Sequence, residues 1–194
     1  FFLAAAALIV PSARANLLYY GIEDTIREDL SVRNVITLQF NETIGHLDYK
    51  VNFDITNLEA KSTFTSAGCT VKDGNVISCD LMGMTAEKNQ LTLSFDTVGT
   101  VKKQDGKYKF SANYGFLPTK RTFVLIRLPQ YSILSEELAN SSFSPASGKT
   151  ISDGRTIAVF WEMEDIGQET LQFAVSYMIP EGIPNYIIVS LTIL

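Results

Sequence analysis

Apolar side chains recur at every second position through most of the interior of the sequence. A period of two places successive side chains on opposite faces of a β-strand, so each run predicts a strand with one buried and one wet face. No segment shows a sustained period of 3.6 residues, which is the mark of an amphipathic helix. The alternating runs are residues 47–55, 91–95, 108–116 and 171–179, with shorter ones at 19–26 and 36–40.

Two further runs are apolar on both faces and predict central strands covered on two sides, at residues 123–128 (Arg127 excepted) and 157–161. Asp-Gly pairs between the runs predict hairpin turns, because glycine adopts positive φ at little steric cost. About ten short strands separated by turns predict an all-β protein, an antiparallel β-sandwich. The Asp-Gly pairs are Asp73-Gly74, Asp105-Gly106 and Asp153-Gly154.

The two ends of the chain carry signals of their own. Residues 1–10 have no polar side chain, and Ala13 and Ala15 follow in the A-x-A pattern of a signal-peptidase site, so residues 1–15 are expected to be a signal peptide. An ordinary buried segment and a pilin-type helix, which Pro11 would break, are the alternatives. Residues 182–194 contain no charge and are expected to begin a truncated transmembrane helix; the alternative is a last β-strand.

These ends leave residues 16–181 as the folding unit, which we expect to lie outside the cytoplasm as the ectodomain of a single-pass type I membrane protein. We expect one continuous domain, with two small sandwiches divided near residue 119 as the alternative. With 16 Lys and Arg against 21 Asp and Glu, the net charge of −5 excludes the basic footprint that a nucleic-acid-binding protein needs.

The two cysteines lie five residues to either side of Gly74, so a hairpin turning there places Cys69 opposite Cys79. Directly opposed residues can come within bonding distance, and an exported protein folds where disulfides form. The sequence therefore predicts a Cys69–Cys79 disulfide, with two free thiols or half of a metal site as alternatives. Asn41 and Asn140 each begin an N-glycosylation sequon in a polar, turn-like stretch and are candidate glycosylation sites.

Catalytic and cofactor motifs are absent from the sequence. His46 is the only histidine and is expected to be an incidental turn residue; no G-x-S-x-G elbow and no glycine-rich phosphate loop is present. Glu162, Glu164 and Asp165 could supply oxygen ligands to Ca²⁺, but a solvated strand edge is the simpler interpretation. Trp161, the single tryptophan, is expected to anchor the core. We expect no catalytic residues, no metal and no cofactor.

The second half of the chain resembles a known protein group through generic strand and turn residues: Leu128-Pro129, Pro145, residues 152–155, residues 157–161 and Tyr177. It is similar to the ectodomain of uncharacterised archaeal single-pass membrane proteins. The resemblance implies a signal peptide, a β-sandwich and one transmembrane helix, in some members followed by a winged helix-turn-helix domain. It supplies no catalytic residue.

The function expected from these features is a non-enzymatic, membrane-anchored sensing or protein-interaction module. Its partners would be the membrane, through the C-terminal helix, and a protein or envelope component. A structural protein of the cell envelope or surface layer is the first alternative. An exported carbohydrate-active or carbohydrate-binding domain is the second.

Overall fold

A computed structural model describes residues 17–115, 117–135, 141–167 and 170–180. Within these ranges the chain forms fifteen β-strands and no helix, which confirms the all-β class. The strands are β1 (Leu17–Ile26), β2 (Val32–Phe40), β3 (His46–Lys50), β4 (Ile55–Ser62), β5 (Ser66–Lys72), β6 (Val76–Met82), β7 (Gln90–Thr97), β8 (Val101–Gln104), β9 (Lys107–Gly115), β10 (Thr119–Arg127), β11 (Ile133–Leu134), β12 (Phe143–Ser144), β13 (Lys149–Ser152), β14 (Ile157–Ile166) and β15 (Thr170–Met178).

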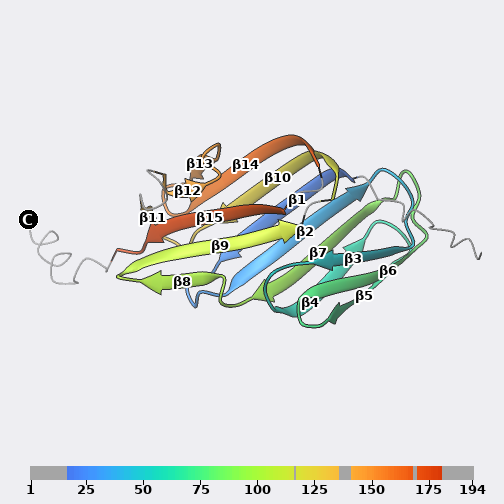
Figure 1. The fold of residues 1–194 in the computed structure, drawn as a ribbon, viewed down its shortest axis with the longest axis horizontal. Coiled ribbons are helices and arrows are strands. Elements are labelled where there is room, and N and C mark those ends of the chain that lie inside the picture. The colour runs from blue at the N-terminus through green and yellow to red at the C-terminus, as the bar shows by residue number, and fades with distance from the viewer. Residues whose placement is uncertain (1–16, 116, 136–140, 168–169, 181–194) are drawn as a thin grey trace, which may run out of the picture.

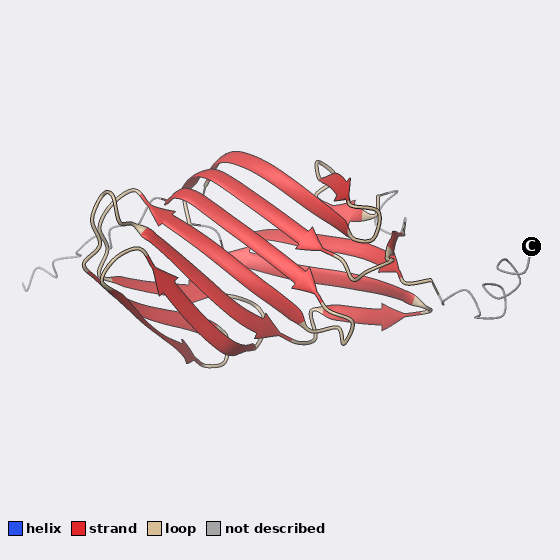
Figure 2. Cartoon of the chain, turned by 180° about the vertical axis from the view of Figure 1, so that it is seen from behind, coloured by secondary structure: helices blue, strands red, loops and turns tan. Residues whose placement is uncertain are grey.

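The strands form two layers, as the predicted sandwich requires. One layer is a seven-stranded sheet in the order β13-β14-β10-β1-β2-β7-β4. The other contains a five-stranded sheet, β11-β15-β9-β8 with β12 on β15, and a three-stranded sheet, β3-β6-β5. In Figure 1 the strands β9 and β15 lie over β1, β2 and β10, and Figure 2 shows the large sheet from the opposite side.

One strand pair departs from the expected antiparallel pattern. β1 runs parallel to β10, with Tyr19 opposite Arg121 and Thr25 opposite Arg127. Parallel neighbours need a long connection, and here residues 27–118 supply it by forming β2 to β9. Strands from both sides of residue 119 therefore lie side by side in the large sheet.

The alternating run at 47–55 forms two strands rather than one. β3 ends at Lys50 and β4 begins at Ile55, and the residues between them carry the chain from the three-stranded sheet to the edge of the large sheet. The period of two hides this break because Val51 and Phe53 still pack against the core on the way. Hydrophobic periodicity reports burial and does not report which sheet a strand joins.

Two of the three expected turns close hairpins with a left-handed backbone at both central residues. Asp73 and Gly74 have φ of 51° and 77°, and Asp105 and Gly106 have φ of 50° and 77°. These values are those of primed hairpin turns, in which Asp-Gly is favoured. They fix the register of β5 on β6 and of β8 on β9.

The core lies between the two layers and is rich in aromatic side chains. Trp161 is 1% exposed, as expected for an anchor, and its ring centroid lies 5.0 Å from that of Phe173 on the opposite layer. Its indole N–H donates to the carbonyl of Pro145 at 2.8 Å. A buried indole needs such an acceptor, so this bond also fixes the segment before β13.

The outer face of the large sheet is less covered than the sequence predicts. Phe123, Leu125 and Phe160 are half-buried there, and no other described element lies over them (Figure 2). They shield one another instead: the rings of Phe123 and Phe160 are 6.0 Å apart, and the Lys149 Nζ lies 5.9 Å from the Phe160 centroid. Apolar residues on both faces therefore indicate a central strand without requiring a third layer.

Both terminal predictions lie outside the described residues, namely the signal peptide at 1–15 with Ala13 and Ala15, and the transmembrane start at 182–194. Across the part of the chain that the structure describes, no helix has the length and apolar character needed to cross a membrane.

Candidate functional site

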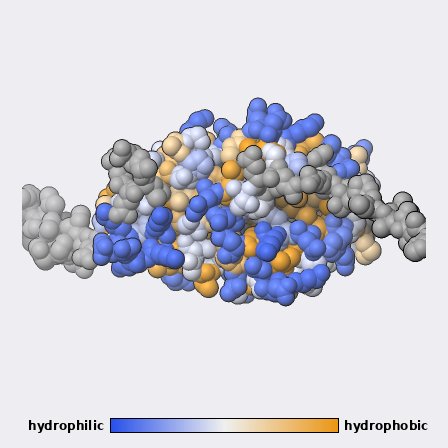
Figure 3. Space-filling view, in the orientation of Figure 1, coloured by the Kyte–Doolittle hydropathy of each residue, from blue (hydrophilic) through white to orange (hydrophobic). Residues whose placement is uncertain are grey.

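A groove opens on the outer face of the second layer, where β8 and β3 meet the same edge of β9. β8 pairs with β9 up to Phe110, the Ser111 N–H donates to the Thr100 carbonyl, and β9 next meets Val51 opposite Tyr114. The space left between β8 and β3 is about 570 Å³, a volume in the range of small-ligand sites. Figure 3 shows this side of the molecule as largely hydrophilic, with hydrophobic side chains in smaller separate areas.

Three charged side chains line the groove. Lys102 and Lys109 are direct cross-strand partners on β8 and β9, and Asp54 comes from the connection between β3 and β4. All three are exposed, and among the described residues no salt bridge includes any of them. The groove therefore has two cationic groups and one anionic group available to a ligand.

The remaining lining combines hydroxyl and apolar groups. Thr100 is only 7% exposed, and its hydroxyl has no hydrogen-bond partner among the described residues. The Ser111 hydroxyl accepts from the Gln172 side-chain amide at 3.1 Å. Phe53 and the exposed Val98 contribute apolar surface.

A second groove lies on the outer face of the large sheet, with a volume of about 700 Å³. Its apolar part comes from Tyr19 and Phe123, and its charges from Arg121, Glu162 and Glu164. The Tyr19 ring lies over Gly21, where a Cβ would come within 2.8 Å of it. Its charged lining is mostly acidic, with one arginine against two glutamates, and Glu162 is already paired with Lys149 at 3.6 Å.

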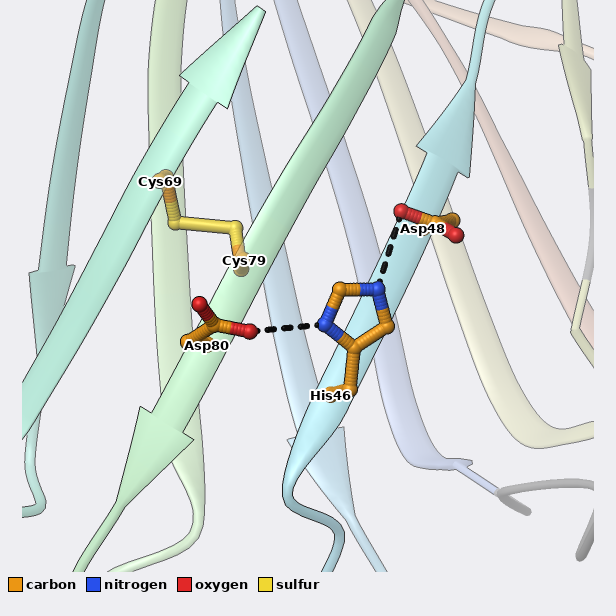
Figure 4. The surroundings of a disulfide bond; sticks show 5 residues. All are labelled: His46, Asp48, Cys69, Cys79 and Asp80. Carbon is orange, nitrogen blue, oxygen red and sulfur yellow. Dashed lines mark hydrogen bonds and ion pairs between the residues drawn. A yellow bond between two sulfur atoms is a disulfide. The ribbon is translucent and has the colours of Figure 1, made fainter. Parts of the chain in front are cut away.

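His46 begins β3 and lies between two carboxylates (Figure 4). Its Nδ1 is 2.9 Å from Asp80 Oδ1, across the β3–β6 pair, and its Nε2 is 3.1 Å from Asp48 Oδ1. Hydrogen bonds to Asp80 and then to Asp48 raise the pKa of the imidazole, because the doubly protonated ring can donate to both. The sequence interpretation as an incidental turn residue missed this arrangement, since Asp80 reaches His46 only through strand register.

The disulfide predicted from the Gly74 turn is present. Cys69 and Cys79 are paired across β5 and β6, with their Cα atoms 4.1 Å apart (Figure 4). Of the candidate glycosylation sites, Asn41 is exposed directly after β2, and Asn140 lies outside the described residues. Glycosylation of either stays a prediction.

The acidic residues at the end of β14 are exposed to solvent. Glu162 lies 3.6 Å from Lys149 Nζ, and Glu164 and Asp165 are exposed. Across residues 17–115, 117–135, 141–167 and 170–180, no three His, Cys, Asp or Glu side chains gather where they could hold a metal ion.

A polar network in the core links the two layers. The Tyr114 hydroxyl on β9 donates to Asp24 on β1, and the Tyr20 and Tyr49 hydroxyls are 2.5 Å apart. Burial raises the pKa of Asp24 to about 7. The network is fully enclosed, so it acts on stability and not on a ligand.

The groove beside β9 draws its residues from three separate segments, 52–54, 98–102 and 109–111. The only sequence signal was the four lysines around Asp105-Gly106 in a chain of negative net charge.

No protein-family model matches the sequence, and the comparison with curated proteins finds no match. The fold does match solved structures. An M1 zinc metallopeptidase from Deinococcus radiodurans, in a mutant form bound to a Tyr-Ser-Ala substrate, matches with a TM-score of 0.52 and 7% identity, covering 86% of this chain and 43% of that one. Another structure of the M1 zinc metallopeptidase from D. radiodurans gives a TM-score of 0.51 and 9% identity over 86% and 42% of the two chains.

Leukotriene A4 hydrolase from Saccharomyces cerevisiae matches with a TM-score of 0.50 and 11% identity, over 84% of this chain and 29% of that one. The chain thus spans less than half the length of the structures it matches. At these identities the likeness establishes the fold.

These matches correct the function expected from the sequence. The expected sensing or interaction module, with its envelope and carbohydrate alternatives, treats the sandwich as a non-enzymatic unit. The structure instead has a fold found within zinc metallopeptidases and within leukotriene A4 hydrolase. A β domain whose fold occurs in larger enzymes need not carry catalytic residues of its own, so their absence from the sequence does not indicate a non-enzymatic protein.

Proposed function

We propose that this chain is the β domain of a metallopeptidase-type enzyme whose zinc-binding catalytic unit lies outside these 194 residues, in the same polypeptide or in a partner. The observation that carries the proposal is the match of 84–86% of the chain to only 29–43% of M1 metallopeptidase and leukotriene A4 hydrolase chains. Such coverage is expected when a chain forms one complete domain and the matched enzyme contains that domain together with others.

The donor groups of this chain do not fit a peptidase zinc site. Such sites use three protein ligands, commonly two histidines and a glutamate. The sequence has one histidine, whose ring nitrogens both face carboxylates, and both cysteines are bound in the disulfide. The proposal therefore places the zinc ion and the hydrolysis of the peptide bond in the other unit.

The sandwich suits a supporting role in such an enzyme. Its two layers are joined by a close-packed aromatic core and by the Tyr114–Asp24 contact, and Lys102, Lys109 and Ser111 of the groove beside β9 lie on strands. Sites built on strands hold ligands in more reproducible positions than sites built on loops. Holding peptide near a catalytic unit is a role that this geometry supports.

The proposal is tested by aminopeptidase assays on two preparations. Alanine 4-nitroanilide should be hydrolysed by the natural polypeptide or complex that contains these residues, and chelation of metal should abolish the activity. The 194-residue chain alone should release no nitroaniline. Hydrolysis by the chain alone, or a natural preparation without peptidase activity, would overturn the proposal.

We also infer folding in an oxidising compartment. The Cys69–Cys79 disulfide supports it, since such bonds are uncommon in proteins kept in a reducing cytosol. Mass spectrometry of the natural protein tests it: an N-terminus at Asn16 and an oxidised cysteine pair are expected, and a retained residue 1–15 segment with free thiols would contradict it.

A further inference from the structure

We propose that the groove beside β9 binds the C-terminal carboxylate of a short peptide. The choice of a peptide rests on the proposed function, whereas the choice of a carboxylate rests on the groove alone. Three observations carry it: the paired lysines, the unpartnered Thr100 hydroxyl and the mixed character of the opposite wall.

The paired lysines form the cationic side of the site. Lys102 and Lys109 face each other directly across β8 and β9, a placement in which like charges repel and weaken the strand pair. Neither lysine forms a salt bridge with a described residue. A carboxylate held between them would remove the repulsion and accept a charge-assisted hydrogen bond from each.

Thr100 lines the groove and carries a buried hydroxyl that no other described group uses. Thr100 is only 7% exposed, and its hydroxyl has no partner among the described groups. Leaving a buried hydroxyl unpaired costs free energy that a hydrogen bond to a ligand recovers. The neighbouring Ser111 hydroxyl, which already accepts from Gln172, can donate to the same ligand.

The opposite wall limits what else the ligand can carry. Asp54 repels a second negative charge and attracts a free amino group, and Asn52 can hydrogen-bond to a peptide unit. Phe53 and Val98 provide apolar contact for a side chain. With a volume of about 570 Å³, the site matches a di- or tripeptide with one carboxylate better than a polyanion.

Binding is tested on the full 194-residue chain with the tripeptide Ala-Phe-Ala, followed by amide chemical shifts and by calorimetry. The expected result is saturable binding that shifts the Thr100, Lys102 and Ser111 amides. The C-terminally amidated tripeptide should bind at least about tenfold more weakly, since it lacks the charge. Equal binding of the amide, equal binding of acetate, or no saturation by the free tripeptide would each overturn the proposal.

Two variants locate the site. K102Q/K109Q should weaken binding of Ala-Phe-Ala at least about tenfold, while the matched variant K61Q/K88Q, with the same loss of charge at exposed positions elsewhere, should change it less than about twofold. An equal effect of both variants would show a general charge effect and overturn the assignment.

The variant Thr100→Val tests whether the Thr100 hydroxyl binds the ligand or stabilises the fold. It should weaken binding without lowering the unfolding temperature, because the hydroxyl has no partner in the free protein. A lower unfolding temperature with unchanged affinity would contradict the assignment. These measurements use the chain alone, so failure to find a catalytic unit would leave their outcome unaffected.

Discussion

The Tyr114 hydroxyl donates a hydrogen bond to the Asp24 carboxyl, and this contact joins β9 of the five-stranded sheet to β1 of the seven-stranded sheet. Both residues are fully or almost fully buried. The same hydroxyl lies 3.4 Å from the side-chain Oδ1 of Asn34, and the Asn34 side-chain Nδ2 donates to the Thr97 hydroxyl at 3.2 Å. Asp24 Oδ1 has no partner among the described groups, which fits a carboxyl that is protonated for part of the physiological pH range.

Asp24 should make the protein less stable as pH rises. Burial raises its pKa from 3.8 to about 7, so between these values the folded state holds a proton that the unfolded chain releases. The contribution of Asp24 to stability is therefore largest below about pH 4 and falls until the pH passes about 7. A difference of about three pH units corresponds to about 4 kcal/mol.

Asp24→Asn should remove most of this pH dependence and leave the protein more stable than the wild type at pH 8. Urea unfolding from pH 4 to pH 9 measures it. His46, whose raised pKa also gives stability that is lost as pH rises, is controlled for by making both proteins in a His46→Gln background. An unchanged pH slope in Asp24→Asn would contradict the assignment.

Tyr114→Phe should destabilise the protein by about 1–3 kcal/mol, because it removes a buried donor and leaves Asp24 without it. The Tyr114 hydrogen bond lowers the pKa of Asp24 against the effect of burial, so its loss should move the pH at which stability falls upward. Tyr131→Phe is the matched control, since Tyr131 is 63% exposed. Equal urea midpoints for the two variants would argue against a linking role for Tyr114.

Removal of the disulfide should cost about 2–3 kcal/mol. Cys69 and Cys79 are ten residues apart, and closing a loop of that size restricts the unfolded chain to about that extent. The variant C69S/C79S should unfold at lower urea concentration than the oxidised wild type and at about the same concentration as the reduced wild type. No difference between oxidised and reduced wild type would show that the bond adds no stability.

His46 should titrate above the usual histidine value of 6.5, because Asp80 and Asp48 both accept hydrogen bonds from its ring. The ring-proton shifts followed by NMR report its pKa directly. Asp80→Asn should lower the pKa more than Asp48→Asn, since the Asp80 hydrogen bond is the larger cause, and Glu164→Gln, on β14 of the seven-stranded sheet, should leave it unchanged. A wild-type value at or below 6.5 would rule out the bridged arrangement.

Gly148→Ala should disturb the Trp161 anchor. A Cβ at Gly148 would lie 2.8 Å from the indole Nε1 and Cε2, so the buried ring must shift and its bond to Pro145 must weaken. Overpacking of this kind costs about 1–3 kcal/mol, and fluorescence of the single tryptophan should change with it. Gly45→Ala, where nothing lies within 4 Å, is the control and should behave like the wild type.

The strands and turns followed from local chemistry, while their assembly did not. Alternation located β7, β9 and β15, and Asp73-Gly74 placed Cys69 opposite Cys79, because both signals act between near neighbours in the chain. The parallel β1–β10 pair and the break after Lys50 depend on contacts between distant segments, which a period of two does not encode.

The groove was missed for the same reason. Lys102 and Lys109 could be paired from the Asp105-Gly106 turn, but Asp54 reaches them only because Val51 meets Tyr114 across the two small sheets. The His46–Asp80 contact likewise depends on the register of β3 on β6. Sites assembled from several strands become visible only when the topology is known.

The central claim, that these residues form a β domain serving a separate zinc-binding unit, is tested most directly by zinc stoichiometry. Elemental analysis should find about one zinc ion per molecule in the natural polypeptide or complex, as in metallopeptidases with a single catalytic zinc, and none in the purified 194-residue chain after dialysis. Stoichiometric zinc in the isolated chain, or no zinc in the natural preparation, would contradict the claim.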